Sequence, residues 1–216
     1  RLLGYAKKLD QLSKKHISSQ LKSDISFQKR DSKLFDYCVI HNPQNLKLSK
    51  IYIYKLKDYA NYSIRDFQIL GGNLTSLISF YKEDKVGIYP DGVISKKVSF
   101  INGISEMLIG SLLASYKFNK YKKIDKEKDK NKKNSKVKIY SSNYSRLEKN
   151  YINVEAISEG TALTRNLVTE PPNVMTPPEI AKNAELLEKI GIKVTVLGEK
   201  EMTKLGMGSL LSVGRA

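Results

Sequence analysis

Residues 166–178 read NLVTEPPNVMTPP and place four prolines within thirteen residues. A residue that precedes proline is disfavoured in the α conformation, so a helix before this stretch is expected to end near Glu170. Thr176 is a favourable N-cap, Pro177 suits the first position of a helix, and Glu179 completes a T-x-x-E capping box. The stretch therefore predicts the end of one helix, a rigid turn and the start of another helix.

Helical spacing of apolar residues continues on both sides of this junction. Residues 151–169 are predicted to form a helix, and residues 177–190 a second one that ends at Gly191 in the left-handed conformation. The segment IKVTVL, residues 192–197, predicts a strand, and EKEMTKLG, residues 199–206, predicts a short helix. This order is typical of an α/β layered domain.

The first half of the chain also alternates between strand and helix patterns. Residues 36–41 and 50–56 are predicted to be neighbouring strands, and in the second strand Ile51 and Ile53 share one face while Tyr52 and Tyr54 share the other. Further strands are predicted at 85–90 and 137–140, and a weak helical period runs through the first thirty residues.

Two helices are predicted between these strands. Ser63 and Asp66 form a capping-box-like start for a helix that runs to Tyr81. Gly71 and Gly72 would weaken this helix by roughly 1 kcal/mol each unless close packing requires them. The second helix runs through 104–116, and its small residues are suited to close packing on a sheet: Gly110, Ser111, Ala114 and Ser115.

Bulk composition favours a soluble cytosolic protein. The chain has 216 residues, 40% of them hydrophobic, which is enough for one or two domains with a sizeable core. No apolar run approaches the roughly 20 residues that cross a bilayer, and the N-terminus lacks a signal-peptide pattern. The chain begins with Arg1 and ends in SVGRA, so we expect a fragment at both ends.

The formal net charge of +16 is concentrated in one segment. Residues 117–150 hold thirteen basic and four acidic residues, whereas residues 151–216 hold seven and eight. Ten of the lysines lie between Lys120 and Lys138. A solvated loop at about 120–136 is the favoured interpretation of this segment. Nucleic-acid binding through it stays open as the alternative, although few aromatic residues are interleaved for base stacking.

The sequence alone assigns no catalytic, cofactor-binding or metal-binding residue. Nucleotide-loop and nucleophile-elbow motifs are absent, so nucleotide binding by the first domain is disfavoured. The single cysteine, Cys38, is expected in a buried strand, and with only His16 and His41 it cannot build a metal site. Glu155 and Glu159 lie four residues apart, as a dinuclear ligand pair would, but a solvent-facing helix edge explains them better.

Residues 160–214 resemble the leucine aminopeptidase (cytosol aminopeptidase) family, and the resemblance extends, weakening toward the start, over roughly residues 50–216. The family pattern is R-[DN]-L-x-N-E-P-x-N-x-x-T-P, followed by a helix, a strand and E-x-x-L-G-M-G-x-L-L-x-V-G. The segment LIGSLLASYKFNKYKK, residues 108–123, is also similar to a helix signature of that family. The pattern is matched by Arg165, Leu167, Glu170, Pro171, Asn173, Thr176, Pro177, Glu201, Leu205, Gly206, Met207, Gly208, Val213 and Gly214.

The chain departs from the family pattern at two places. Thr169 stands where the family usually has asparagine, which is expected to loosen a hydrogen bond that fixes the turn. Arg215 and Ala216 stand where the family continues with Q-G-S.

The resemblance implies a two-domain α/β fold. Residues 1–145 would form a macro-domain-like α/β/α layer, residues 146–170 a linking helix, and residues 171–216 the start of an α/β metallo-hydrolase domain. It also implies a cytoplasmic homo-hexamer that acts on peptides with two divalent ions, zinc or manganese. The family's metal ligands lie beyond the last motif, so the chain by itself is expected to be inactive, or to serve as a nucleic-acid-binding or assembly module.

Overall fold

The computed structural model describes residues 34–42, 48–93, 95–122 and 135–214. The weak helical pattern of the first thirty residues lies outside these ranges, as does the middle of the lysine-rich segment. The chain divides into two compact units. The first comprises Arg1–Lys117 with Tyr121–Ser158, and the second comprises Phe118–Lys120 with Glu159–Ala216. The predicted domain boundaries stay predictions.

In the first unit, strands β1 (Phe35–His41) and β2 (Lys50–Leu56) form an antiparallel pair. Their register places Phe35 opposite Leu56 and His41 opposite Lys50. Phe35 is fully buried, and Tyr52 and Tyr54 pack against the same core. The predicted pair of neighbouring strands, and the separate face for the two tyrosines, are confirmed.

A second strand pair is parallel. Strands β3 (Lys85–Ile88) and β4 (Lys136–Ile139) align with Lys85 opposite Lys136 and Ile88 opposite Ile139. A long connection that contains helix α4 (Phe100–Ser115) joins them, as parallel pairing requires. The predicted strands at 85–90 and 137–140 are confirmed, each within two residues of its expected bounds.

Helix α3 (Ile64–Phe80) begins as predicted. The Ser63 hydroxyl accepts a hydrogen bond from the Asp66 N–H, and the Asp66 carboxylate accepts one from the Ser63 N–H. Helix α4 is capped by Ser99 in a similar way and therefore begins before the predicted residue 104. Between the strands and these helices a short 3₁₀ turn, η2, spans Tyr59–Asn61.

Helices α3 and α4 cross at glycines. A Cβ atom on Gly71 would lie 1.8 Å from the Met107 carbonyl oxygen, and one on Gly110 would lie 2.0 Å from the Gln68 carbonyl oxygen. The Ser111 hydroxyl donates across the crossing to the Gly71 carbonyl at 3.0 Å. Close packing thus explains Gly71, whereas a Cβ atom on Gly72 would make only ordinary contacts, the nearest at 3.7 Å. The expectation that the small face of α4 packs on a sheet is wrong, because its partner is another helix.

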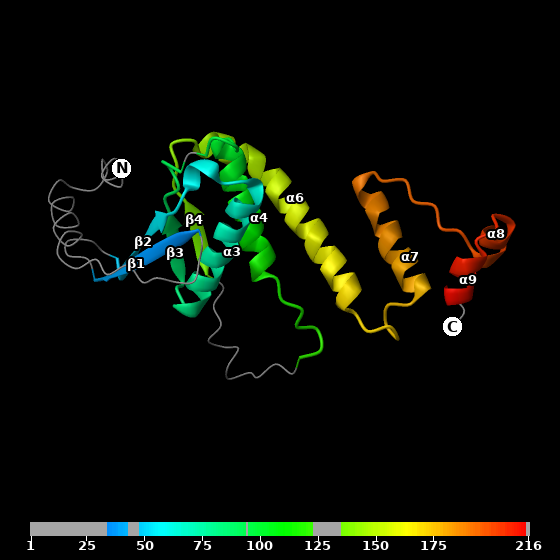
Figure 1. Ribbon diagram of the computed structural model, residues 1–216. Helices are drawn as coiled ribbons and strands as arrows, with labels where there is room; N and C mark the ends of the chain where they lie inside the picture. Colours follow the sequence, from blue (N-terminus) through cyan, green and yellow to red (C-terminus); the bar gives the residue numbers. More distant parts are fainter. Residues whose placement is uncertain (1–33, 43–47, 94, 123–134, 215–216) are drawn as a thin grey trace. The chain divides into compact units, whose positions relative to one another are not determined.

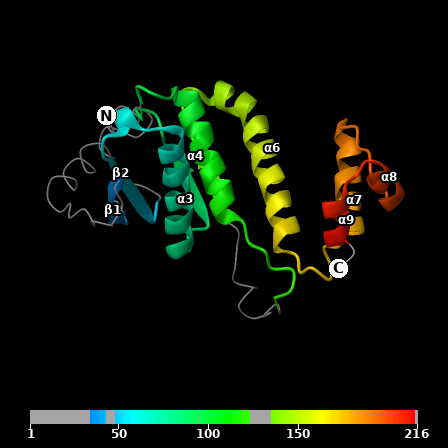
Figure 2. The same cartoon turned by 45° about the vertical axis from the view of Figure 1, so that its right-hand side comes forward.

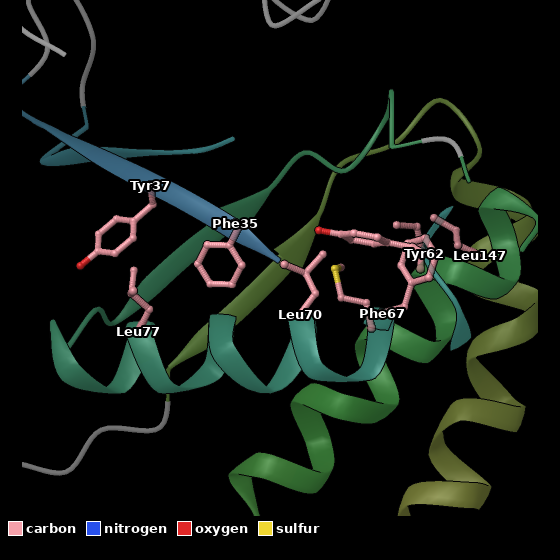
Figure 3. Packing of buried hydrophobic residues seen from close by; sticks show 9 residues of the cluster. Phe35, Tyr37, Tyr62, Phe67, Leu70, Leu77 and Leu147 are labelled. Carbon is pink, nitrogen blue, oxygen red and sulfur yellow. The ribbon is translucent and has the colours of Figure 1, made fainter. Parts of the chain in front are cut away.

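The core of the first unit lies between the strands and α3. Figure 3 shows Phe35 and Tyr37 of β1 directed toward Leu70 and Leu77 of α3. In Figures 1 and 2 the strands lie on one side of α3 and α4. The most deeply buried side chains are large and apolar: Phe35, Phe67, Ile104 and Val154.

Helix α6 (Tyr144–Thr169) starts earlier than the predicted Tyr151. Its first turns are held by Leu147, which is buried in the core, and Val154 one heptad later is also buried. The Asn150 amide donates to the Ser105 hydroxyl of α4 at 2.6 Å. The helix therefore begins about two turns earlier than predicted. The prediction relied on apolar spacing from residue 151 onward, which does not show that Leu147 is buried.

The second unit contains helix α7 (Pro177–Glu185), a 3₁₀ turn η3 (Leu186–Ile190), and helices α8 (Glu199–Lys204) and α9 (Gly208–Gly214). Gly191 ends η3 with φ of 86°, as predicted. The predicted strand at 192–197 is wrong, since these residues form no ladder. Strand patterns become strands only when a neighbour pairs with them, and the described part of this unit contains no strand.

None of the helices in the described ranges combines the length and apolarity that a membrane-spanning segment needs.

Candidate functional site

The proline-rich junction forms the turn that its sequence predicts. Helix α6 ends at Thr169, and the Glu170 N–H is the last to donate to a carbonyl of that helix. The N–H groups of Val174 and Met175 then donate to the Pro171 carbonyl oxygen, each at 2.9 Å. Because one carbonyl closes the turn with two donors, the direction of the chain between α6 and α7 is fixed by local bonds.

The start of α7 differs from the predicted capping box. Thr176 is the N-cap residue and Pro177 occupies the first helical position, as expected. The Thr176 side chain, however, makes no capping hydrogen bond. The Glu179 carboxylate accepts from the Lys182 ammonium at 3.2 Å instead. Proline at the first position, which needs no N–H partner, therefore starts this helix without the reciprocal bonds.

Thr169 occupies the position where the family pattern usually has asparagine. Its hydroxyl donates to the Arg165 carbonyl oxygen, one turn back in α6, at 2.6 Å. The side chain thus bonds to its own helix and not to the turn that follows.

Glu170 forms an ion pair within the second unit. Its carboxylate accepts from the Lys120 ammonium at 2.5 Å, and the Glu170 side chain is only 8% exposed while that of Lys120 is 55% exposed. The pair joins residues 118–120 to the end of α6 across fifty positions of sequence. Glu170 is therefore a structural anchor at the junction.

The two carboxylates considered as a metal pair do not form a site in the structure. Glu155 and Glu159 are both exposed on α6. Across the described ranges, no three His, Cys, Asp or Glu residues lie close enough together to hold a metal ion. The described residues do not fit the two divalent ions that the family resemblance implies, so no metal ligand is assigned to them.

Twelve residues of the lysine-rich segment, 123–134, lie outside the described ranges. At its ends, Lys120 pairs with Glu170, and Lys136 and Lys138 are exposed on β4. Cys38 lies in β1 opposite Ile53.

A polar cluster at the edge of the first unit was not predicted from the sequence. Glu83, which follows α3, accepts from the Lys50 ammonium at 2.7 Å and from the Tyr52 hydroxyl at 2.8 Å. The Lys50 ammonium also lies 5.4 Å from the centre of the Tyr81 ring. Such a cluster cannot be predicted from sequence spacing, because Lys50 and Glu83 are far apart in the sequence and are brought together only by the packing of β2 against the end of α3.

The cluster shifts the ionisation of its members. Burial acts to raise the pKa of Glu83, but the hydrogen bonds from Lys50 and Tyr52 outweigh it, so the pKa is lowered. Burial, followed by the bond to Glu83 and its charge, raises the pKa of the Tyr52 phenol. Glu83 is thus a carboxylate that accepts two hydrogen bonds. Both bonds connect β2 to the residue that follows α3, and we assign Glu83 a structural role.

Sequences of known proteins are similar to both units of the chain. Residues 162–216, all within the second unit, match the family model described as the cytosol aminopeptidase family, catalytic domain. A probable cytosol aminopeptidase of Rhizobium leguminosarum is 34% identical over 174 residues, which is 80% of this chain and 34% of the relative. One from Brucella suis is 43% identical over 112 residues, 51% of this chain and 22% of the relative.

Two solved structures share the fold. A tomato leucine aminopeptidase mutant has a TM-score of 0.61 at 20% identity over 94% of this chain and 38% of its own. A bottromycin maturation enzyme, BotP, in complex with Mn has a TM-score of 0.59 at 17% identity over 79% of this chain and 34% of its own. The chain spans about a third of the length of the curated relatives it matches. It resembles members of the cytosol aminopeptidase family over 80% of its length, and residues 162–216 match the catalytic domain of that family.

Proposed function

We propose that this chain forms the N-terminal part of a metal-dependent aminopeptidase that removes N-terminal amino acids from peptides. In this proposal the first unit is a folded support, and the second unit is the first segment of the catalytic domain. The match of residues 162–216 to the catalytic-domain model carries the proposal. A cytosolic location, supported by the relatives' names, and assembly as a homo-hexamer belong to the same proposal.

The burial pattern supports this division of roles. The first unit buries a core of large apolar residues, whereas no described residue of the second unit is fully buried. Ile190 is 73% exposed, Leu205 62% and Val213 76%. Side chains of this kind are normally covered in a folded domain. We infer that further catalytic-domain structure covers them in the active enzyme.

The proposal also places catalysis outside these 216 residues. In the described ranges no three His, Cys, Asp or Glu residues lie close enough together to hold a metal ion, Glu170 pairs with Lys120, and Glu83 accepts hydrogen bonds from Lys50 and Tyr52. The 216-residue chain is therefore expected to support the site without performing the reaction.

Hydrolysis of a leucine amide substrate tests the proposal. The purified chain is assayed with added manganese or zinc and again after chelation, with the Rhizobium leguminosarum relative as positive control. We expect no metal-dependent hydrolysis by the chain alone. A chimera in which residues 1–216 replace the matching third of that relative should show chelator-sensitive activity. Chelator-sensitive hydrolysis by the isolated chain would contradict the proposed division of roles.

A further inference from the structure

Strands β3 and β4 carry nearly the same five residues. Residues 85–89 read KVGIY and residues 136–140 read KVKIY. The strands pair in parallel with these patterns in register, so that Lys85 lies opposite Lys136 and Gly87 opposite Lys138. Residues of like chemistry therefore line up across the pair.

The alternation of strand residues separates the two faces of this pair. Ile88 and Ile139 pack against the core of the first unit. Side chains two residues apart share a face and adjacent ones do not, so the lysines and the tyrosines that follow the strands are on the opposite face. That face, here named the tyrosine–lysine face, consists of Lys85, Tyr89, Lys136, Lys138 and Tyr140, and all five are exposed.

The two tyrosines form a stacked pair at the carboxyl ends of the strands. Their ring centres lie 4.9 Å apart with an interplanar angle of 12°. Tyr89 is nevertheless 60% exposed and Tyr140 46% exposed. A Cβ atom on Gly87 would lie 3.1 Å from the Tyr140 ring, so glycine leaves room for this ring beside the strand. The pair is held in position and also presents aromatic surface to solvent.

The charges on this face are unfavourable for the strand pair alone. Like charges directly opposite each other in a sheet are destabilising, and Lys85 faces Lys136. Neither five-residue pattern contains an acidic residue. The carboxylate of Asp91, which follows Tyr89 closely, accepts hydrogen bonds from the Ser141 hydroxyl and the Ser142 N–H. An external anion would relieve the repulsion between the lysines.

We propose that the tyrosine–lysine face binds single-stranded nucleic acid. Exposed aromatic rings stack on unpaired bases, and lysines beside them neutralise the phosphates between those bases. A duplex hides its bases and would use only the lysines. An acidic peptide would likewise leave the rings unused. The observations combine stacked rings with lysines on one face, which is the combination that unpaired bases and phosphates require together.

Fluorescence anisotropy with a labelled thymidine oligonucleotide of about 12 nucleotides, and with the corresponding duplex, tests the proposal on the full 216-residue chain. The single strand should bind more tightly than the duplex. Stacking is worth about 1–3 kcal/mol per base, so Tyr89→Ala should weaken single-strand binding by about tenfold, whereas Tyr89→Phe should retain it. Tyr151→Ala, an exposed tyrosine on α6 outside the face, is the matched control and should have no effect.

The lysines are tested by salt dependence. Each phosphate contact contributes about 0.7 to the slope of log affinity against log salt for single strands, so Lys85→Gln should reduce the slope by about that amount. Lys200→Gln, an exposed lysine in the second unit, should not. Circular dichroism confirms that each variant is folded, and Tyr140→Ala provides a second ring variant.

Three outcomes would overturn the proposal. The first is no single-strand binding at low salt. The second is binding that Tyr89→Ala and Tyr140→Ala leave unchanged, which would assign the contact to the lysine-rich segment alone. The third is self-association that the ring variants abolish, which would make the face an interface between copies of this chain. None of these results depends on peptidase activity, so the proposal and the proposed function can fail separately.

Discussion

Replacing Gly71 with alanine should destabilise the first unit by forcing α3 and α4 apart. The added Cβ would lie 1.8 Å from the Met107 carbonyl oxygen, 2.8 Å from its carbonyl carbon and 3.0 Å from the Ser111 nitrogen. All three are backbone atoms, so no side-chain rotation can relieve the contact. The closest approach is 1.2 Å shorter than the 3.0 Å below which real Cβ contacts essentially do not occur.

Two opposing effects set the magnitude. Alanine is favoured over glycine inside a helix by about 1 kcal/mol. Overpacking a well-packed interface costs about 1–3 kcal/mol, and more where the backbone has to move. The clash at Gly71 involves backbone on both helices, so the steric cost should exceed the gain in helix propensity. We expect Gly71→Ala to lower the free energy of unfolding by about 2 kcal/mol.

Urea unfolding followed by circular dichroism measures this change. Gly160→Ala is the matched control, because Gly160 lies inside α6 and nothing lies within 4 Å of the position of its Cβ. That variant should be as stable as the parent chain or slightly more stable. In the double variant with Gly110→Ala, the loss should be smaller than the sum of the single losses, since helices already separated accept the second methyl group more easily. A Gly71→Ala variant at least as stable as Gly160→Ala would refute the close crossing.

Three further substitutions test local contacts. Glu83→Gln should lower the free energy of unfolding at neutral pH. Because the pKa of Glu83 is lowered in the folded state, its contribution to stability is present above the unfolded-state pKa and is lost as pH falls through the folded-state pKa. The stability difference, measured by urea unfolding at several pH values, should therefore shrink in acid, and a pH-independent difference would contradict the ion-pair cluster. Ser63→Ala should lower the free energy of unfolding by about 1 kcal/mol, because it removes a formed capping box. Thr176→Ala should lower it clearly less, because that side chain makes no capping hydrogen bond. Equal losses of stability in thermal unfolding would show that the Thr176 cap forms in solution.

Local signals in the sequence predicted most of the helices. The serine and aspartate at the start of α3 and the prolines between α6 and α7 act through neighbouring backbone groups, so their effects can be read without knowing the rest of the fold. Alternation predicted the neighbouring strands β1 and β2, whereas the parallel pairing of β3 with β4 was not predicted. The strand predicted at residues 192–197 was wrong because a strand requires a pairing partner, and alternation or β-branching in the sequence does not show whether such a partner is present.

The interactions that distinguish this molecule are long-range. The small face of α4 indicated close packing, but the identity of its partner, α3, depends on where the glycines of two helices meet. The pairs Lys50–Glu83 and Lys120–Glu170 join residues far apart in sequence. The repeated K-V-x-I-Y pattern was visible in the sequence, yet its meaning required the parallel register that places Tyr89 beside Tyr140.

Hydrogen exchange of the 216-residue chain, followed by mass spectrometry, tests the central claim that the first unit is a self-supporting domain and the second is a segment without its own core. The account predicts slow exchange in α3 and α4, where the buried residues lie, and fast exchange throughout α7, α8 and α9. Protection of α7–α9 equal to that of α3 and α4 would contradict it, because the second unit would then be stable without further catalytic-domain structure.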